Sequence, residues 1–114
     1  MDKETKMLKA KTLGMLGLVK KAGKLIIGTD RVTDTVRSNT PGLTLIASDA
    51  SDNTKKRAIN CCDYYKAEYQ IIDVTAEELA HAIGRSNNIS VIFITDKNFT
   101  AVLKELIMGC KSGF

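Results

Sequence analysis

Few side chains in this sequence of 114 residues have the types and spacing that catalysis or metal binding requires. His81 is the only histidine, and it lies in a stretch that is typical of the middle of a helix. A structural zinc ion takes four ligands, and the sequence offers His81 no second histidine and no Cys-x-x-Cys pair. We therefore expect no metal site and no cofactor.

The sequence contains three cysteines, which are Cys61, Cys62 and Cys110. Adjacent cysteines on one helix point about 100° apart, because a turn takes 3.6 residues, and this direction suits a disulfide poorly. The pattern favours small buried or half-buried thiols in a reducing compartment. A redox role for Cys61 and Cys62 is the alternative, and the pKa of the two thiols would decide it.

Two carboxylates, Asp49 and Asp52, follow a predicted buried strand, where they could in principle share acid–base work. The same loop leads into a helix, and Asp49, Ser51 and Asp52 are the residue types that loops and helix starts require. The sequence has no Gly-x-Ser-x-Gly elbow and suggests no Cys–His pairing. We expect capping here and predict that the protein is not an enzyme.

Two groups of cations stand out, one around the end of the first predicted helix and one in the first two turns of the third: Lys20, Lys21 and Lys24, and Lys55, Lys56 and Arg57. Cations near a helix N-terminus oppose the helix dipole, whereas a bound phosphate would be stabilised there. A solvated helix face explains the second group equally well on local grounds. The net charge of +4 and the pI near 9.0 agree with a nucleic-acid partner.

Helices and strands alternate along the chain. The apolar pattern predicts strands over residues 25–27, 43–48, 69–74 and 89–95. Helices are predicted over residues 5–21, from 29 or 30 through 36, over 52–65 and 76–84, and from 96 onward. This alternation predicts an α/β fold: a three-layer α/β/α sandwich with a four-stranded mixed sheet. We expect one domain over residues 1–114, with a short flexible tail from about residue 110.

Helix starts and buried helix faces can be assigned at several positions. Thr29 or Asp30 is the predicted N-cap of the second helix, and Thr75 with Glu78 forms a capping box before the fourth. The predicted inward residues of the first helix are Leu8, Thr12, Met15, Val19 and Ala22. Those of the last helix are Phe99, Val102, Leu103, Leu106 and Ile107.

No apolar run approaches the roughly 20 residues that span a bilayer. The N-terminal residues alternate in charge and lack the apolar stretch of a signal peptide. We expect a cytoplasmic protein without a membrane partner.

Several motifs, in order, resemble the kink-turn RNA-binding ribosomal protein superfamily of the archaeal large-subunit "seven-Ae" type: Gly23-Lys24-x-x-x-Gly28-Thr29, Leu45-Ile46-Ala47-Ser48-Asp49-Ala50, Leu79-x-x-Ala82-x-Gly84 and the apolar strand Val91–Thr95. Three further motifs resemble its bacterial YlxQ-like subgroup: Asp49-Ala50-Ser51-x-Asn53-Thr54-x-Lys56, Cys62-x-Tyr64-Tyr65 and Thr95-Asp96-x-x-Phe99. The resemblance covers about residues 13–103. It implies the same α/β/α sandwich that the alternation of elements predicts.

The resemblance also implies a function, which is non-enzymatic binding of structured RNA, either kink-turn-like or ribosomal, by a ribosome-associated monomer. Ribosomal proteins are then expected as further partners. In this family the start of the second helix reads two sheared G·A pairs, and the loop before the last strand covers a flipped-out nucleotide. Together with the basic groups, these places give the predicted RNA-binding residues: Lys24, Gly28, Thr29, Asp30, Arg31, Lys55, Lys56, Arg85, Ser86, Asn87 and Asn88.

The family's strongest binders carry Asn-Glu after Gly-Thr, where this chain has Asp30 and Arg31. A carboxylate can accept hydrogen bonds from guanine N1–H and N2–H₂, and an arginine can donate to guanine O6 and N7 or to a phosphate. We therefore expect Asp30 and Arg31 to recognise the G·A pairs in place of the family's Asn-Glu. The alternative is a protein-interaction adaptor that has kept the fold, because Asp30 and Asp34 would repel phosphates.

Overall fold

The computed structural model describes residues 3–112, with the side chains of residues 6–107. Nine elements follow one another: α1 (Lys3–Lys21), β1 (Leu25–Ile27), α2 (Thr29–Arg37), β2 (Leu43–Ala47), α3 (Asp52–Tyr65), β3 (Tyr69–Ile72), α4 (Ala76–Ala82), β4 (Val91–Ile94) and α5 (Lys97–Ser112). The predicted alternation of helices and strands is confirmed.

Several boundaries differ from the predicted ones by two residues, among them the ends of β3 at Ile72 and of α4 at Ala82. Two further differences have clear reasons. The backbone N–H of Ile89 donates to the carbonyl oxygen of Ala76 at 3.1 Å, so the chain before Val91 is tied to α4 and not to a strand. Helix α5 runs to Ser112, past the predicted start of a tail at residue 110. Residues 113 and 114 lie outside the described part of the chain.

The four strands form one mixed sheet, as predicted, and their order is β1-β4-β2-β3. Strand β4 is antiparallel to both β1 and β2, with Ile27 beside Ile92 and Ile46 beside Val91, while β3 is parallel to β2. The carboxyl ends of β1, β2 and β3 therefore meet the start of β4 at one end of the sheet. We call this the β4-entry end and the opposite one the β4-exit end.

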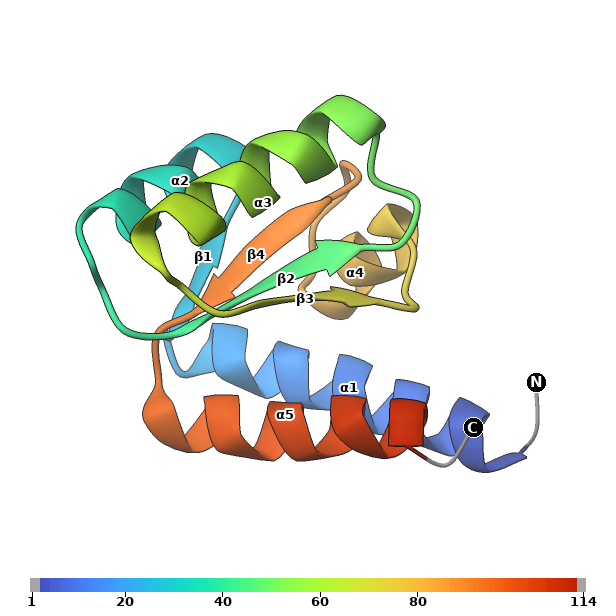
Figure 1. The fold of residues 1–114 in the computed structure, drawn as a ribbon. Coiled ribbons are helices and arrows are strands. Elements are labelled where there is room, and N and C mark those ends of the chain that lie inside the picture. Colours follow the sequence, from blue (N-terminus) through green and yellow to red (C-terminus); the bar gives the residue numbers. More distant parts are fainter. Residues whose placement is uncertain (1–2, 113–114) are drawn as a thin grey trace.

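Helices cover both faces of the sheet. Figure 1 shows α2 and α3 on one face and α1, α4 and α5 on the other, which is the predicted α/β/α sandwich. Side chains alternate along β2, so Leu45 packs in the core under α1, α4 and α5, whereas Ile46 packs under α2 and α3. Burial on both faces explains why β2 and β4 are almost entirely apolar. Within residues 3–112, no helix combines the length and apolarity of a membrane span.

Two predicted inward residues are exposed. Ala22 lies past the end of α1, where Gly23 at φ 72° turns the chain toward β1. Val102 is 40% exposed, because α5 turns Leu103 and Ile107 into the core and Val102 flanks that face. Leu16 of α1 was not among the predicted inward residues, but it is fully buried in the core between the sheet and α1, α4 and α5.

Candidate nucleic-acid interface

Backbone hydrogen bonds join several chain segments at the β4-entry end. The N–H of Gly28, just before α2, donates to the carbonyl oxygen of Val91 at 3.0 Å. The N–H of Ala47, at the end of β2, donates to the carbonyl oxygen of Ser90 at 2.8 Å. The start of α2, the connection into α3 and the loop before β4 therefore surround one end of the sheet, and these segments carry most of the predicted site residues.

The start of α2 depends on Gly28. Its backbone lies at φ 103° and ψ 143°, a conformation that essentially only glycine adopts without strain. Gly28 is the N-cap of α2, and its carbonyl oxygen accepts from the N–H of Val32 at 2.9 Å. The prediction that Thr29 or Asp30 caps α2 is therefore wrong, because both already belong to the first turn. The Asp30 carboxylate is free for another contact.

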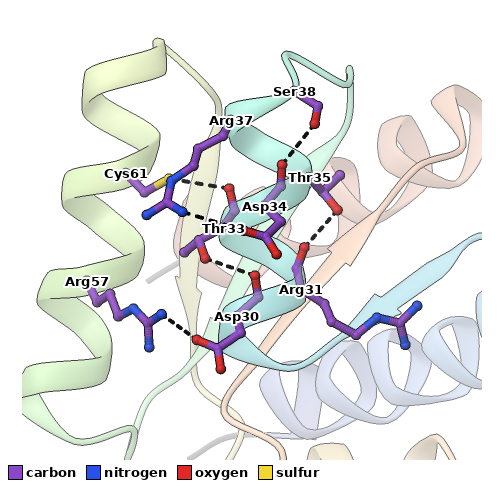
Figure 2. Close-up of polar contacts among 9 residues, drawn as sticks. All are labelled: Asp30, Arg31, Thr33, Asp34, Thr35, Arg37, Ser38, Arg57 and Cys61. Atoms are coloured by element: carbon purple, nitrogen blue, oxygen red, sulfur yellow. Dashed lines mark hydrogen bonds and ion pairs between the residues drawn. The ribbon is translucent and has the colours of Figure 1, made fainter.

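Asp30 makes that contact with Arg57 in the second turn of α3. The Arg57 guanidinium donates to the Asp30 carboxylate, and the two side chains remain 51% and 79% exposed. A pair this exposed adds little to the free energy of unfolding. It does fix the direction of Arg57, which is held against the start of α2 (Figure 2).

Arg31 points the other way. In Figure 2 its side chain extends from the far side of α2, away from Asp30 and Arg57. Arg31 is exposed and forms no salt bridge with any described side chain. Asp30 and Arg31 are neighbours in sequence, but in this structure they do not face the same group.

Two carboxylates near the β4-entry end, Asp30 and Asp49, are engaged within the protein, whereas Asp52 and Asp73 are exposed. Asp49 accepts from the N–H of Ala76 at 2.8 Å, so it does cap a helix, but that helix is α4 and not α3. Of the two residues expected to cap α3, Ser51 and Asp52, the N-cap is Ser51, which accepts from the N–H of Thr54 at 3.1 Å. In contrast, Lys56 and Arg85 are exposed, Lys55 is partly exposed, and none of the three is salt-bridged within residues 6–107. Lys55, Lys56 and Arg85 are therefore available to an anionic ligand.

Residues 10–104 match the model of the ribosomal protein L7Ae/L30e/S12e/Gadd45 family. The chain belongs to this family. It is similar to two proteins named RNA-binding protein YlxQ. The one from Bacillus subtilis (strain 168) is 34% identical over 93 residues, 82% of this chain and 91% of that protein. The one from Enterococcus faecium is 34% identical over 100 residues, 87% of this chain and 93% of that protein. The expected superfamily and YlxQ-like subgroup are thereby confirmed.

Solved structures agree with an L7Ae-type fold. A protein of unknown function from Bacillus halodurans C superposes with a TM-score of 0.79 and 31% identity, over 87% of this chain and 98% of that one. A 15.5kD RNA binding protein from Giardia lamblia superposes with a TM-score of 0.72 over 98% of both chains. Its identity of 18% is low, so this second likeness supports the fold alone.

Within this L7Ae-type structure, Lys24 is the predicted site residue that does not lie at the β4-entry end. Its carbonyl oxygen accepts from the N–H of Thr95 at 2.9 Å, which places it at the β4-exit end. Four residue steps along β1 separate Lys24 from Gly28, a distance of about 13 Å. Lys24 therefore lies with Lys20 and Lys21 near the end of α1. The other predicted site residues lie on segments at the β4-entry end.

The two described cysteines are free thiols, and Cys62 is fully buried under α3. Its Sγ lies 3.6 Å from the hydroxyl of Thr44, and burial raises the pKa of the Cys62 thiol. A raised pKa reduces the fraction of thiolate, which is the reactive form. Cys61 donates from Sγ to the carbonyl oxygen of Thr33 at 3.7 Å. This environment speaks against the redox alternative. Cys110 lies outside the side chains that the structure describes.

The helix that carries the 85–88 loop begins with the predicted capping box. The carboxylate of Glu78 accepts from the N–H of Thr75 at 3.0 Å, and the Thr75 hydroxyl accepts from the N–H of Glu78 at 3.1 Å. Lys9 of α1 lies 3.0 Å from the same carboxylate. The Thr75 hydrogen bond and then the Lys9 contact hold the pKa of Glu78 below its usual value of 4.5.

This arrangement predicts how stability depends on pH. A depressed pKa means that the charged carboxylate stabilises the fold above pH 4.5, and that this contribution is lost as the pH falls through the lower pKa of the folded state. Glu78→Gln should therefore be less stable than the wild type near neutral pH and approach it in acid. Urea unfolding at several pH values measures the difference, with Glu77→Gln as the control for removing a charge from the same turn. A Glu78→Gln difference that does not change with pH would contradict the prediction.

Proposed function

We propose that this chain binds structured RNA at the β4-entry end and acts by binding, without catalysis. One observation carries the proposal: cations from three chain segments surround one end of the sheet, while two carboxylates there, Asp30 and Asp49, are engaged within the protein. Arg31, Lys56 and Arg85 represent the three segments. Membership of the L7Ae family and the two relatives named as RNA-binding proteins support it.

The proposed RNA is kink-turn-like or ribosomal. A protein that contacts a bent RNA better than an extended one stabilises the bend by that difference in affinity. In our proposal Arg31 donates to a guanine edge or a phosphate, because its guanidinium has no competing partner among the described residues. Asp30 then acts as a positioning residue that holds Arg57 toward the RNA. We further propose that the protein is a cytoplasmic monomer that associates with ribosomes and contacts ribosomal proteins.

A protein-interaction adaptor is the second candidate, and one observation favours it. The carboxylates of Asp30 and Asp34 on α2 remain 79% and 75% exposed, although arginines contact both. Exposed carboxylates weaken phosphate binding along that helix. The two candidates respond differently to salt, because RNA binding releases counterions and falls steeply with ionic strength, whereas an apolar protein interface does not.

Lys55 and Lys56 provide a test that separates these candidates. Lys55→Ala and Lys56→Ala should each weaken binding to all RNAs alike and reduce the slope of log affinity against log salt by about 1. Fluorescence anisotropy at several KCl concentrations measures the slope. Lys97→Ala, an exposed cation at the β4-exit end, is the matched control. If the slopes of both α3 variants equal that of the wild type, the phosphates lie elsewhere.

A further inference from the structure

A cavity of about 750 Å³ opens between α1 and α4, on the side of the sheet away from α2 and α3. We call it the α1–α4 groove. Leu13 and Gly14 contribute to one wall, while Arg85, Ser86 and Asn88 line it from the loop before β4. Its size falls within the range of pockets that hold small ligands. Because the loop residues also belong to the proposed RNA interface, the groove continues that interface around the loop onto α1.

The glycines of α1 are informative because glycine is less favourable than alanine inside a helix. Gly17 has a packing reason, since a Cβ there would come within 3.2 Å of the carbonyl oxygen of Ala82 on α4. Gly14 has none, because a Cβ at that position would meet no atom within 4 Å. The structural consequence of glycine at position 14 is that the groove stays open down to the helix backbone.

The groove has a mixed lining of apolar, polar and charged side chains. Two carboxylates line it, Glu77 and Glu78, and that of Glu78 is already engaged by Thr75 and Lys9. Leu13, which is partly exposed, offers apolar surface to the face of a base. Ser86 and Asn88 provide donors and acceptors for a base edge, and Arg85 provides a cation for a phosphate. These loop side chains are exposed and form no hydrogen bond or salt bridge with the described side chains. Proteins that recognise a particular RNA sequence mostly contact unpaired bases, because these can leave the base stack.

From these observations we propose that the α1–α4 groove binds an unpaired nucleotide in a single-stranded flank of the RNA, beyond the part that α2 contacts. The base lies against Leu13 and the backbone at Gly14, and its phosphate lies near Arg85. This inference rests on the proposed RNA-binding function. It adds a second contact on the opposite face of the sheet, so that the bound RNA passes around the loop before β4.

The test uses two forms of one kink-turn RNA, blunt or extended by a short unpaired adenosine flank at either end. The wild type should bind a flanked form roughly tenfold more tightly, which is the effect expected of one well-placed base. Gly14→Leu fills the groove and should remove this preference while leaving the blunt RNA bound as before. Ala10→Leu adds the same side chain one helical turn away, outside the groove lining, and should keep the preference.

A second variant and a second readout guard against a folding defect. Asn88→Ala approaches the same groove from the loop and should also reduce the preference for the flanked form. With 2-aminopurine in the flank, the wild type should change the probe's fluorescence and Gly14→Leu should not. Equal wild-type affinity for blunt and flanked RNA, or an unchanged preference in both groove variants, would overturn the inference and leave the proposed function standing. Wild-type protein that binds neither form would overturn both.

Discussion

Replacing Arg31 with alanine is expected to weaken the binding of a kink-turn RNA by about 1–3 kcal/mol, the range found for an arginine that contacts a base edge. This corresponds to a dissociation constant roughly 5 to 150 times larger. The free protein loses no salt bridge in the variant, because Arg31 is exposed and points away from Asp30 and Arg57. The change should therefore appear in affinity and not in the free energy of unfolding.

Two further variants sharpen this test. Arg37→Ala removes a cation from the last turn of the same helix, at the β4-exit end, and should leave RNA affinity close to that of the wild type. Arg31→Lys keeps the charge but cannot donate two parallel hydrogen bonds. If Arg31→Lys binds like the wild type, Arg31 contacts a phosphate, and if it binds like the alanine variant, Arg31 reads a base edge. An Arg31→Ala affinity equal to that of the wild type would contradict the proposed role of Arg31.

Replacing Gly28 with alanine is expected to lower the free energy of unfolding by about 1–3 kcal/mol, the cost of a residue held in a conformation reserved for glycine. The backbone at φ 103° cannot relax freely, because the Gly28 N–H donates to Val91 and its carbonyl oxygen accepts the first hydrogen bond of α2. Relief of the strain would move the first turn of α2, which carries Asp30 and Arg31. RNA affinity should therefore fall together with stability. Urea unfolding and an RNA titration on the same preparation measure both.

A matched glycine separates these two effects. Gly23 also has a positive φ of 72°, but it lies at the end of α1 near the β4-exit end. Gly23→Ala should lower stability without changing the affinity of the folded protein for RNA. Equal losses of affinity in the two variants would contradict the view that Gly28 positions the binding residues.

Local sequence patterns predicted most of the fold because their causes lie within a few residues. The Thr75–Glu78 capping box spans one helical turn, and the apolar runs at β2 and β4 directly reflect burial on both faces. The cap of α2 was predicted wrongly for the opposite reason. Thr29 is a favourable N-cap type, but the bond from Gly28 to Val91 of another strand starts the helix one residue earlier.

The contacts of the candidate site depend on packing between distant segments. Asp30 and Arg57 are 27 positions apart in the sequence and meet because α2 packs beside α3. The same holds for Asp49, whose residue type predicts capping but not that the capped helix is α4. The resemblance to the family predicted which segments carry the site, whereas the side-chain directions of Asp30 and Arg31 follow from the structure alone.

The most direct test of the proposed function is a titration of the purified protein with a kink-turn RNA at two salt concentrations. The control is the same RNA with its sheared G·A pairs changed to Watson–Crick pairs. Our account predicts tighter binding to the G·A form and weaker binding to both RNAs at the higher salt concentration. Equal or absent binding to the two RNAs would contradict kink-turn recognition and favour the adaptor candidate.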